Sequence, residues 1–274
     1  SNWEAARIGQ QPKGHRMELS EQSKGRLQGK VALVTGAARG VGFATAQRFC
    51  QEGATVLMSD INSEQGEAAA AQIGARFILL DVAQEADWQR CTALIAEDYG
   101  RLDILVNNAA ILRSSDILQE SLQQWRQVMA VNADSVFLAI HYLLPIISAS
   151  GAGSIINMSS SSALMGMPHF CAYTAAKAAV RNLTMSTAVL CKQQGSGVRC
   201  NSVHPDGINT KMAREIAADM PADVIAGYQR TAPFICQPED VASTILFLAS
   251  DESRHINGAA ICLDNTATIH PPYL

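Results

Sequence analysis

Short apolar runs rich in β-branched residues alternate with Ala-rich stretches of helical periodicity from Lys30 onward. Apolar runs of this kind are typical of parallel strands that are buried on both faces, and each Ala-rich stretch can cross over between two strands. The predicted strands are residues 31–35, 55–59, 76–80, 104–107, 154–158, 199–204 and 259–263. The pattern therefore predicts an α/β fold, a doubly wound, Rossmann-type parallel sheet of about seven strands flanked by helices.

The stretches between these strands are predicted to be helical. They cover residues 40–51, 63–73, 85–99, 122–147, 173–193 and 238–249. Ser121 with Gln124, and Pro238 at a first helical position, are typical helix start signals. Residues 207–233 contain no strand pattern. Because they follow a strand at the carboxyl edge of the sheet, we expect a mobile substrate loop there.

Length and composition indicate one folded domain. The chain has 274 residues, of which 48% are hydrophobic, so it can bury a sizeable core, and no linker or repeat divides residues 26–264. The first residues are polar and contain no apolar signal-peptide core, and Met17 resembles a natural start. We therefore expect residues 1–25 to be a disordered tail or a non-native remnant.

Charge and cysteine usage exclude several classes of function. A net charge of −4 without a Lys/Arg cluster argues against nucleic-acid binding. The most apolar run, residues 136–147, is interrupted by His141 and Pro145, so we expect no membrane span and a soluble, cytoplasmic protein. The seven cysteines stand singly, without the spacing of a zinc site, and we expect reduced thiols and no bound metal.

A glycine-rich turn follows the first predicted strand and leads directly into a helix. Its sequence is Thr35-Gly36-Ala37-Ala38-Arg39-Gly40-Val41-Gly42. Glycines permit a tight turn and let a phosphate approach backbone N–H groups, and the start of a helix favours negative charge. The spacing differs from the usual G-x-G-x-x-G. In this strand-to-helix context, the turn still predicts a site for the pyrophosphate of a dinucleotide.

Asp60 ends the second strand about twenty residues further on, where a carboxylate accepts hydrogen bonds from the ribose hydroxyls of NAD. Arg39 argues for the opposite preference, because a cation in the glycine turn can meet the additional phosphate of NADP. We give Asp60 more weight, since a carboxylate beside that phosphate would be repelled in a partly desolvated site. The predicted cofactor is NAD.

Tyr173 and Lys177 lie four residues apart on a predicted helix, so their side chains share one face. A nearby ammonium and a positively charged nicotinamide both favour the phenolate form of a tyrosine, which lowers its pKa toward a working range. We therefore expect Tyr173 to exchange a proton with a substrate hydroxyl. Four serines, Ser159 to Ser162, follow a predicted strand nearby in the sequence and offer hydroxyls for the substrate oxygen.

Taken together, these elements resemble the short-chain dehydrogenase/reductase family. The resemblance covers residues 27–264 and is carried by Thr35-Gly36 with Gly40 and Gly42, Asn107-Asn108-Ala109, Ser160, and Tyr173 with Lys177. It implies that Ser160 hydrogen-bonds the substrate oxygen, and that Asn132 helps hold a water linked to the active-site lysine. Residues 26–274 would form the dinucleotide-binding and catalytic domain.

The resemblance also implies a set of cofactor-binding residues. Beyond the glycine turn with Arg39 and Val41, Asp60 and the catalytic Tyr173 and Lys177, the set comprises Ile61, Asp81, Val82, Asn108, Ala109, Pro205, Gly207, Ile208 and Thr210. Two positions depart from the family pattern. Ala110 stands where the family often has Gly, and Asp206 separates Pro205 from Gly207 where Pro-Gly is usual.

Within the family, several segments, among them His204-Pro205-Asp206-Gly207-Ile208, resemble bacterial hydroxysteroid dehydrogenases of the 3β/17β type. A bulky apolar alcohol or ketone such as a hydroxysteroid is therefore the expected small-molecule substrate. Candidate pocket residues are Leu164, Met165, His169, Phe170, Met212 and Met220. We assign no proton transfer to His169 or His204.

Two alternatives stay open: a dehydrogenase for another cyclic or aliphatic secondary alcohol, and a non-catalytic NAD-binding sensor. An oxoacyl-carrier-protein reductase is disfavoured, because it would require NADPH and a basic docking patch. The Ala-rich faces of helices 122–147 and 173–193 permit close packing. Together with the resemblance, they imply a homotetramer.

Overall fold

The computed structural model describes residues 25–219, 222, 226 and 235–269. Within this part of the chain, parallel strands form one seven-stranded sheet in the order β3-β2-β1-β4-β5-β6-β7. The strands are β1 (Val31–Thr35), β2 (Thr55–Asp60), β3 (Arg76–Leu79), β4 (Ile104–Asn107), β5 (Ser154–Met158), β6 (Arg199–Pro205) and β7 (Ala260–Leu263). Strand order reverses between β1 and β4, which is where doubly wound sheets bind ligands. The predicted single-domain fold is confirmed.

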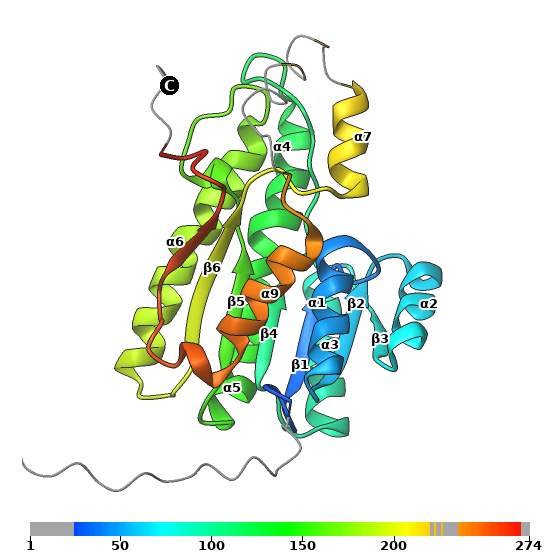
Figure 1. The fold of residues 1–274 in the computed structure, drawn as a ribbon, viewed down its shortest axis with the longest axis vertical. Coiled ribbons are helices and arrows are strands. Elements are labelled where there is room, and N and C mark those ends of the chain that lie inside the picture. Colours follow the sequence, from blue (N-terminus) through cyan, green and yellow to red (C-terminus); the bar gives the residue numbers. More distant parts are fainter. Residues whose placement is uncertain (1–24, 220–221, 223–225, 227–234, 270–274) are drawn as a thin grey trace, which may run out of the picture.

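Helices cover both faces of this sheet (Figure 1). They are α1 (Gly40–Gln51), α2 (Ser63–Ile73), α3 (Glu85–Asp98), α4 (Leu122–Met129), α5 (Ser135–Ala149), α6 (Cys171–Gln193), α7 (Lys211–Asp219) and α9 (Pro238–Ala249). On one face, Trp88 of α3, Leu143 of α5 and Val180 of α6 share a buried cluster. On the other face, Phe49 of α1 packs in a cluster with Ile245 of α9. Two apolar layers therefore hold the sheet between them.

The central strands are buried at every position because both of their faces are covered. β1, β4 and β5 have no residue exposed to solvent, whereas the edge strands β3 and β7 are partly exposed. This is the reason that continuous apolar runs, rather than alternating ones, marked the strands in the sequence. The predicted strand ends differ from the observed ends by at most one residue.

The helix predicted for residues 122–147 is not uniform. A π-helical turn, Ala130–Asp134, separates α4 from α5. At its centre, the Asn132 side chain accepts a hydrogen bond from Ile111 N at 2.8 Å and donates one to Ile111 O at 2.7 Å. The prediction of one continuous α-helix was therefore wrong, because a contact with a distant loop accompanies the wider turn and periodicity does not report such contacts.

The segment predicted as a substrate loop is described only in part. It contains α7, and Ile208 forms an isolated parallel bridge with Cys236. Residues 220, 221, 223–225 and 227–233 of that prediction lie outside the described residues, as do residues 1–24 of the predicted tail. The expected mobility of both segments stays a prediction.

Among the described residues, one helical run, Leu122–Ala149, is long and apolar enough to cross a membrane, with a mean hydropathy of 1.5 over its most apolar window. The expectation that His141 and Pro145 exclude such a run was wrong by this criterion, because the mean hydropathy of the window stays high although both residues lie in the helical run. In that window 44% is buried inside the protein, and Leu143 and Ile147 belong to the core beside the sheet. A core helix meets the same criterion, so this run is weak evidence for a membrane span.

Candidate active site

Three predicted catalytic side chains meet at the carboxyl edge of the sheet. Ser160 follows β5, whereas Tyr173 and Lys177 lie one turn apart on α6. The Ser160 side chain lies close enough to Tyr173 to lower the pKa of its phenol, and Lys177 Nζ lies 5.5 Å from the centre of the Tyr173 ring. A hydroxyl, a phenol and an amine are therefore brought together, although they are separated by up to 17 positions in the chain.

The hydroxyls of Ser159 and Ser161 hold the loop that carries Ser160 and are engaged in other bonds. Ser159 Oγ donates to Lys177 O at 2.8 Å, and Ser161 Oγ donates to the Asp206 carboxylate at 3.3 Å. Ser160 Oγ also accepts a hydrogen bond from Ser162 N at 3.1 Å. Of these four serines, Ser160 is the one whose side chain lowers the pKa of Tyr173.

Burial dominates the electrostatics of this site. It raises the pKa of Tyr173 to about 12, although the hydrogen bond with Ser160 lowers that pKa. It lowers the pKa of Lys177 to about 8. In the protein alone, desolvation raises the pKa of Tyr173 and Lys177 is not among the groups that lower it, so the expected lowering of the tyrosine pKa by Lys177 is not found. At neutral pH the phenol is neutral and the amine is largely charged.

Lys177 is buried and has a defined backbone partner. Its Nζ donates to Met158 O, at the end of β5, at 2.7 Å. A lysine ammonium has three donors, so this bond leaves two for other groups. The bond also holds the amine beneath the site, at the position expected from the shared helix face.

Asn132 is buried, and the structure gives its amide to Ile111, as described above. The side chain therefore clamps the loop that follows β4 onto the π turn. Within the described residues both side-chain bonds of Asn132 go to Ile111 and none goes to Lys177, although the amide retains a second lone pair and a second N–H. Its expected role toward a water stays a prediction.

The glycine turn is tight, as the sequence suggested, but packing within the protein also requires two of its glycines. Gly36 and Gly40 have φ of 61° and 58°, in the left-handed region that favours glycine. A Cβ on Gly42 would lie 2.3 Å from Gly36 O, and one on Gly36 would lie 2.8 Å from Ala109 Cα. At these two positions, glycine is required by packing within the protein, as well as by any phosphate.

The start of α1 can accept an anion. Within the described chain, its N-cap residue Arg39 makes no side-chain capping bond, and its first turn holds no acidic residue. Gly40 and the buried Val41 begin the helix, and Thr210, which follows β6, has its Cγ2 3.7 Å from the position a Gly40 Cβ would take. The turn and the segment after β6 thus face each other. Backbone N–H groups at such a helix start fit a pyrophosphate.

Asp60 lies where the ribose carboxylate was predicted. Its two carboxylate oxygens accept hydrogen bonds from Ala38 N and Asn62 N, both at 3.1 Å. These bonds aim the carboxylate at the glycine turn from the end of β2. Ile61 beside it is 68% exposed, so its side chain is open to a ligand. Arg39 is exposed as well.

The remaining predicted cofactor residues differ in what their side chains contact. Asp81 accepts a hydrogen bond from Ala83 N at 3.0 Å, and Val82 is buried in the core, so only its backbone faces a ligand. Asn108 donates to Thr35 O at 2.9 Å and to Gly36 O at 3.1 Å. The Asn108 amide therefore braces the glycine turn rather than lining an open groove. Ala109 N is bound to Thr35 Oγ1 at 3.0 Å.

Pro205, the last residue of β6, is buried, whereas Gly207 is exposed and Ile208 is half-buried. Among the candidate substrate residues, Leu164 is 38% exposed, and Met165, His169 and Met212 are half-buried. Phe170 is 6% exposed and belongs to the interior, which explains its apolar character without a ligand. Met220 lies outside the described residues.

The contacts of three buried polar side chains near the site, Asn107, Asn157 and His204, were missed in the sequence. Asn107 donates to Asn157 at 2.8 Å, and Asn157 donates to Thr184 at 2.9 Å, which links β4, β5 and α6 beneath the site. His204 is fully buried on β6 and bonds to the Ser160 carbonyl. An Asn inside an apolar strand run was the signal that could have predicted the Asn107–Asn157 pair, since buried amides nearly always have a hydrogen-bond partner.

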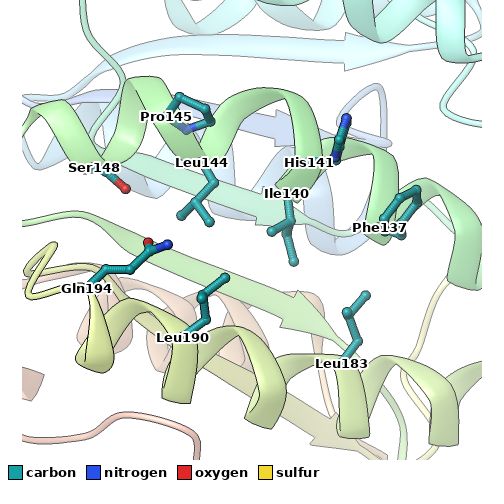
Figure 2. A pocket seen from close by; sticks show the side chains of 9 residues that line it. All are labelled: Phe137, Ile140, His141, Leu144, Pro145, Ser148, Leu183, Leu190 and Gln194. Atoms are coloured by element: carbon teal, nitrogen blue, oxygen red, sulfur yellow. The ribbon is translucent and has the colours of Figure 1, made fainter.

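A separate pocket of about 470 Å³ lies between α5 and α6, and Figure 2 shows side chains from both helices facing it. It is lined by Phe137, Ile140, His141, Leu144, Pro145, Ser148, Leu183, Leu190 and Gln194. None of the predicted catalytic residues lines it. Within the described residues, no group of His, Cys, Asp or Glu side chains could hold a metal ion, and all seven cysteines are free thiols.

Comparison with known proteins supports the same family as the motifs. A family model described as enoyl-(acyl carrier protein) reductase matches residues 36–268. A 3-beta-hydroxysteroid dehydrogenase of Comamonas testosteroni is 40% identical over 249 residues, which are 88% of this chain and 96% of that protein. A 3-alpha-(or 20-beta)-hydroxysteroid dehydrogenase of Mycobacterium bovis is 39% identical over 242 residues, which are 88% of this chain and 90% of that protein.

A third relative carries information on the cofactor. The NADP-dependent (R)-specific alcohol dehydrogenase of Lentilactobacillus kefiri is 36% identical over 250 residues, which are 89% of this chain and 98% of that protein. These relatives are named as dehydrogenases, and the family as a whole uses nicotinamide cofactors. The chain belongs to the short-chain dehydrogenase/reductase family of oxidoreductases.

Proposed function

We propose that this protein interconverts a secondary alcohol and a ketone, with NAD as the hydride carrier and Tyr173 as the acid/base. The observation that carries the proposal is the contact between Ser160 and Tyr173, with Lys177 Nζ 5.5 Å from the phenol ring. When bound, NAD accepts a hydride from the alcohol carbon or returns it to the ketone. Tyr173 takes or gives the hydroxyl proton, and Ser160 holds the oxygen.

Lys177 would assist Tyr173 through its charge. With a pKa of about 8, the amine carries its proton at neutral pH, and a cation near the phenol favours the phenolate. A positively charged nicotinamide ring would act in the same direction. Of these two charges, only that of the nicotinamide is absent from the protein alone, in which burial holds the tyrosine pKa near 12. Proton transfer is therefore tied to the presence of the oxidised cofactor.

We assign NAD rather than NADP on the basis of Asp60. Its carboxylate is oriented toward the glycine turn by bonds from Ala38 N and Asn62 N, so it would repel a phosphate on the ribose. The exposed Arg39 favours NADP, and one relative is named as NADP-dependent. A fixed carboxylate outweighs a flexible, exposed guanidinium because only the former is held in place.

Asn132 is proposed as a supporting residue. It stands in a π turn, and π turns inside α-helices occur frequently at functional sites. Its amide fixes Ile111, two residues after Ala109, so it steadies the loop that borders the cofactor site. The water linked to Lys177 would then be held by backbone atoms of the π turn.

The substrate we propose is a bulky apolar alcohol such as a hydroxysteroid. Two relatives that match 88% of the chain are named as hydroxysteroid dehydrogenases, and Leu164, Met165 and Met212 offer partly open apolar surface. Another cyclic or aliphatic secondary alcohol is the alternative within the same chemistry. A non-catalytic NAD-binding sensor is disfavoured by the Ser160–Tyr173–Lys177 arrangement.

Self-association is part of the proposal. Phe137 on α5 and Leu190 on α6 are 52% and 42% exposed, and both line the apolar pocket between the helices (Figure 2). A second copy packed on this face would cover these side chains, as a homotetramer requires. A cytoplasmic location is likewise a proposal.

The direct test is an absorbance assay for reduced nicotinamide. The purified protein would be given NAD or NADP with hydroxysteroids, cyclic alcohols and aliphatic secondary alcohols. Turnover of a hydroxysteroid with NAD supports the full proposal. Activity on other alcohols alone would contradict the steroid as substrate, and a preference for NADP would contradict the role assigned to Asp60. No activity with any substrate of the panel would favour the non-catalytic sensor.

A further inference from the structure

His204 is a buried titratable group that the mechanism above does not use. It lies near the end of β6 with 0% of its surface exposed. Its Nδ1 is 2.9 Å from Ser160 O, and its Nε2 is 2.8 Å from Ser202 Oγ. The imidazole thus spans from its own strand to the backbone of the residue that carries the substrate-binding hydroxyl.

These two contacts determine the tautomer. A carbonyl oxygen only accepts hydrogen bonds, so Nδ1 must carry the proton and donate to Ser160 O. In the neutral ring, Nε2 then accepts from the Ser202 hydroxyl. Burial lowers the pKa of His204, and the nearby charges of Arg181 and Lys177 lower it further, whereas the bond to Ser160 raises it. The ring is therefore neutral at physiological pH, with a fixed orientation.

Ser160 has few other ties to the sheet. Its carbonyl also accepts a bond from Ala163 N at 3.0 Å, but that bond closes a turn within the same loop. The preceding residue, Ser159, is tied to Val203 O at 2.9 Å. The backbone of β6 thus binds Ser159, and the His204 imidazole adds a bond from β6 to the carbonyl of the next residue, Ser160. Without it, the Ser160 peptide can rotate while the strand pairing is retained.

We propose that His204 is a positioning residue, whose Nδ1–H holds the Ser160 carbonyl and thereby sets the place from which the Ser160 hydroxyl meets Tyr173 and the substrate oxygen. The inference rests on the proposed role of Ser160 in alcohol oxidation. It assigns no proton transfer to the imidazole. A misplacement of about 1 Å at a reacting group can cost about 100-fold in rate, so a tie of this kind has a measurable effect.

Two substitutions of His204 test the roles of its two ring nitrogens separately. The amide nitrogen of Asn overlays Nδ1 of an imidazole, whereas that of Gln overlays Nε2. His204→Asn therefore retains a donor for Ser160 O, and His204→Gln retains only the contact with Ser202. We expect His204→Gln to lower kcat for alcohol oxidation about 30-fold with KM and the Kd for NADH little changed, and His204→Asn to restore turnover to within about threefold of wild type.

A double-mutant cycle tests whether His204 acts through Ser160. In a Ser160→Ala background, the loss caused by His204→Gln should largely disappear, because the hydroxyl to be positioned is absent. Val198→Ala, at a buried position directly before β6, is the matched control for destabilisation of the strand. It should lower the melting temperature without changing kcat.

The inference is overturned if Gln and Asn lower kcat equally, if Gln is as active as wild type, or if the losses are additive in the Ser160→Ala background. Should the Gln variant fail to fold, ¹⁵N NMR of the wild-type histidines decides, since a proton on Nε2 rather than Nδ1 of His204 contradicts the tie. Failure of the proposed function is distinguishable, because wild type would then be inactive or Ser160→Ala would be fully active.

Discussion

At the carboxyl edge of the sheet, buried polar groups hold one another in place, whereas the pocket between α5 and α6 is lined mainly by apolar side chains. Lys177 is bound to Met158 O at 2.7 Å and Ser159 to Lys177 O at 2.8 Å. The pocket of about 470 Å³ contains none of these groups. This pocket and the candidate catalytic groups thus lie in different parts of the described molecule, which is the arrangement that the proposals of a second copy at the pocket and of catalysis at the polar edge require.

The largest effect on the polar edge of the sheet is expected from removing the Tyr173 phenol. Tyr173→Phe deletes the proton donor and acceptor while leaving the ring in place, so kcat should fall about 1,000-fold. The Kd for NADH, measured by fluorescence, should change little, because the ring still fills its place beside the cofactor site. Retention of wild-type turnover by this variant would remove Tyr173 from the mechanism.

Lys177 gives the next largest effect, on stability. Its pKa is lowered by burial to about 8 from 10.5, so between these pH values the unfolded chain binds a proton that the folded chain does not. Stability should therefore rise with pH through this window, and the full cost of burial is present below it. Relative to Lys177→Met, the unfolding free energy of wild type should increase by about 3 kcal/mol from pH 8 to 10.5.

This stability prediction is measured by urea unfolding of both proteins at equal concentration. The difference between the two proteins isolates the lysine, because other titrating groups are common to both. A difference that does not vary with pH would mean that the amine is not desolvated in the folded protein.

The cofactor end is tested by Asp60→Ala. Loss of the carboxylate removes the repulsion of a ribose phosphate, so kcat/KM for NADP should rise relative to NAD by about tenfold or more. Arg39→Ala in the same background should reverse part of that gain, since its cation would then be the remaining phosphate contact. An unchanged NAD/NADP ratio in Asp60→Ala would contradict the assigned ribose site.

The smallest effect on chemistry is expected in the pocket. Phe137→Glu with Leu190→Glu introduces charge on the apolar face and should shift sedimentation toward smaller species. The kcat should stay within about twofold of wild type. Leu118→Glu, at a position that is 92% exposed before α4, is the control and should leave assembly intact. A loss of turnover without a change in assembly would place the pocket in the catalytic site.

Sequence patterns predicted the sheet well because its strands are buried on both faces, so each appears as a short continuous apolar run. Helical spacing also placed Tyr173 and Lys177 together, whereas the choice of Ser160 among four neighbouring serines came from the family resemblance. The π turn at Asn132 was beyond reach, because it accompanies hydrogen bonds to Ile111, 21 residues away. Local periodicity contains no record of such pairs.

His204 and Asn108 illustrate the second limit. A lone histidine in a strand is most often a packed side chain, and only its contact with Ser160 O reveals a tie to the catalytic loop. Asn108 was expected to line the cofactor groove, but its amide bonds to the Thr35 and Gly36 carbonyls. Residue type and position were informative in both cases, whereas the direction of the side chain depended on the tertiary structure.

The central claim is that hydride transfer is coupled to a proton passing through Tyr173, and pH–rate profiles in both directions test it most directly. Alcohol oxidation with NAD should rise with pH, and ketone reduction with NADH should fall, because one proton leaves or enters through the phenol. The apparent pKa in oxidation should lie below the value of about 12 for the protein alone. Profiles that are flat, or that are unchanged in the residual activity of Tyr173→Phe, would contradict the account.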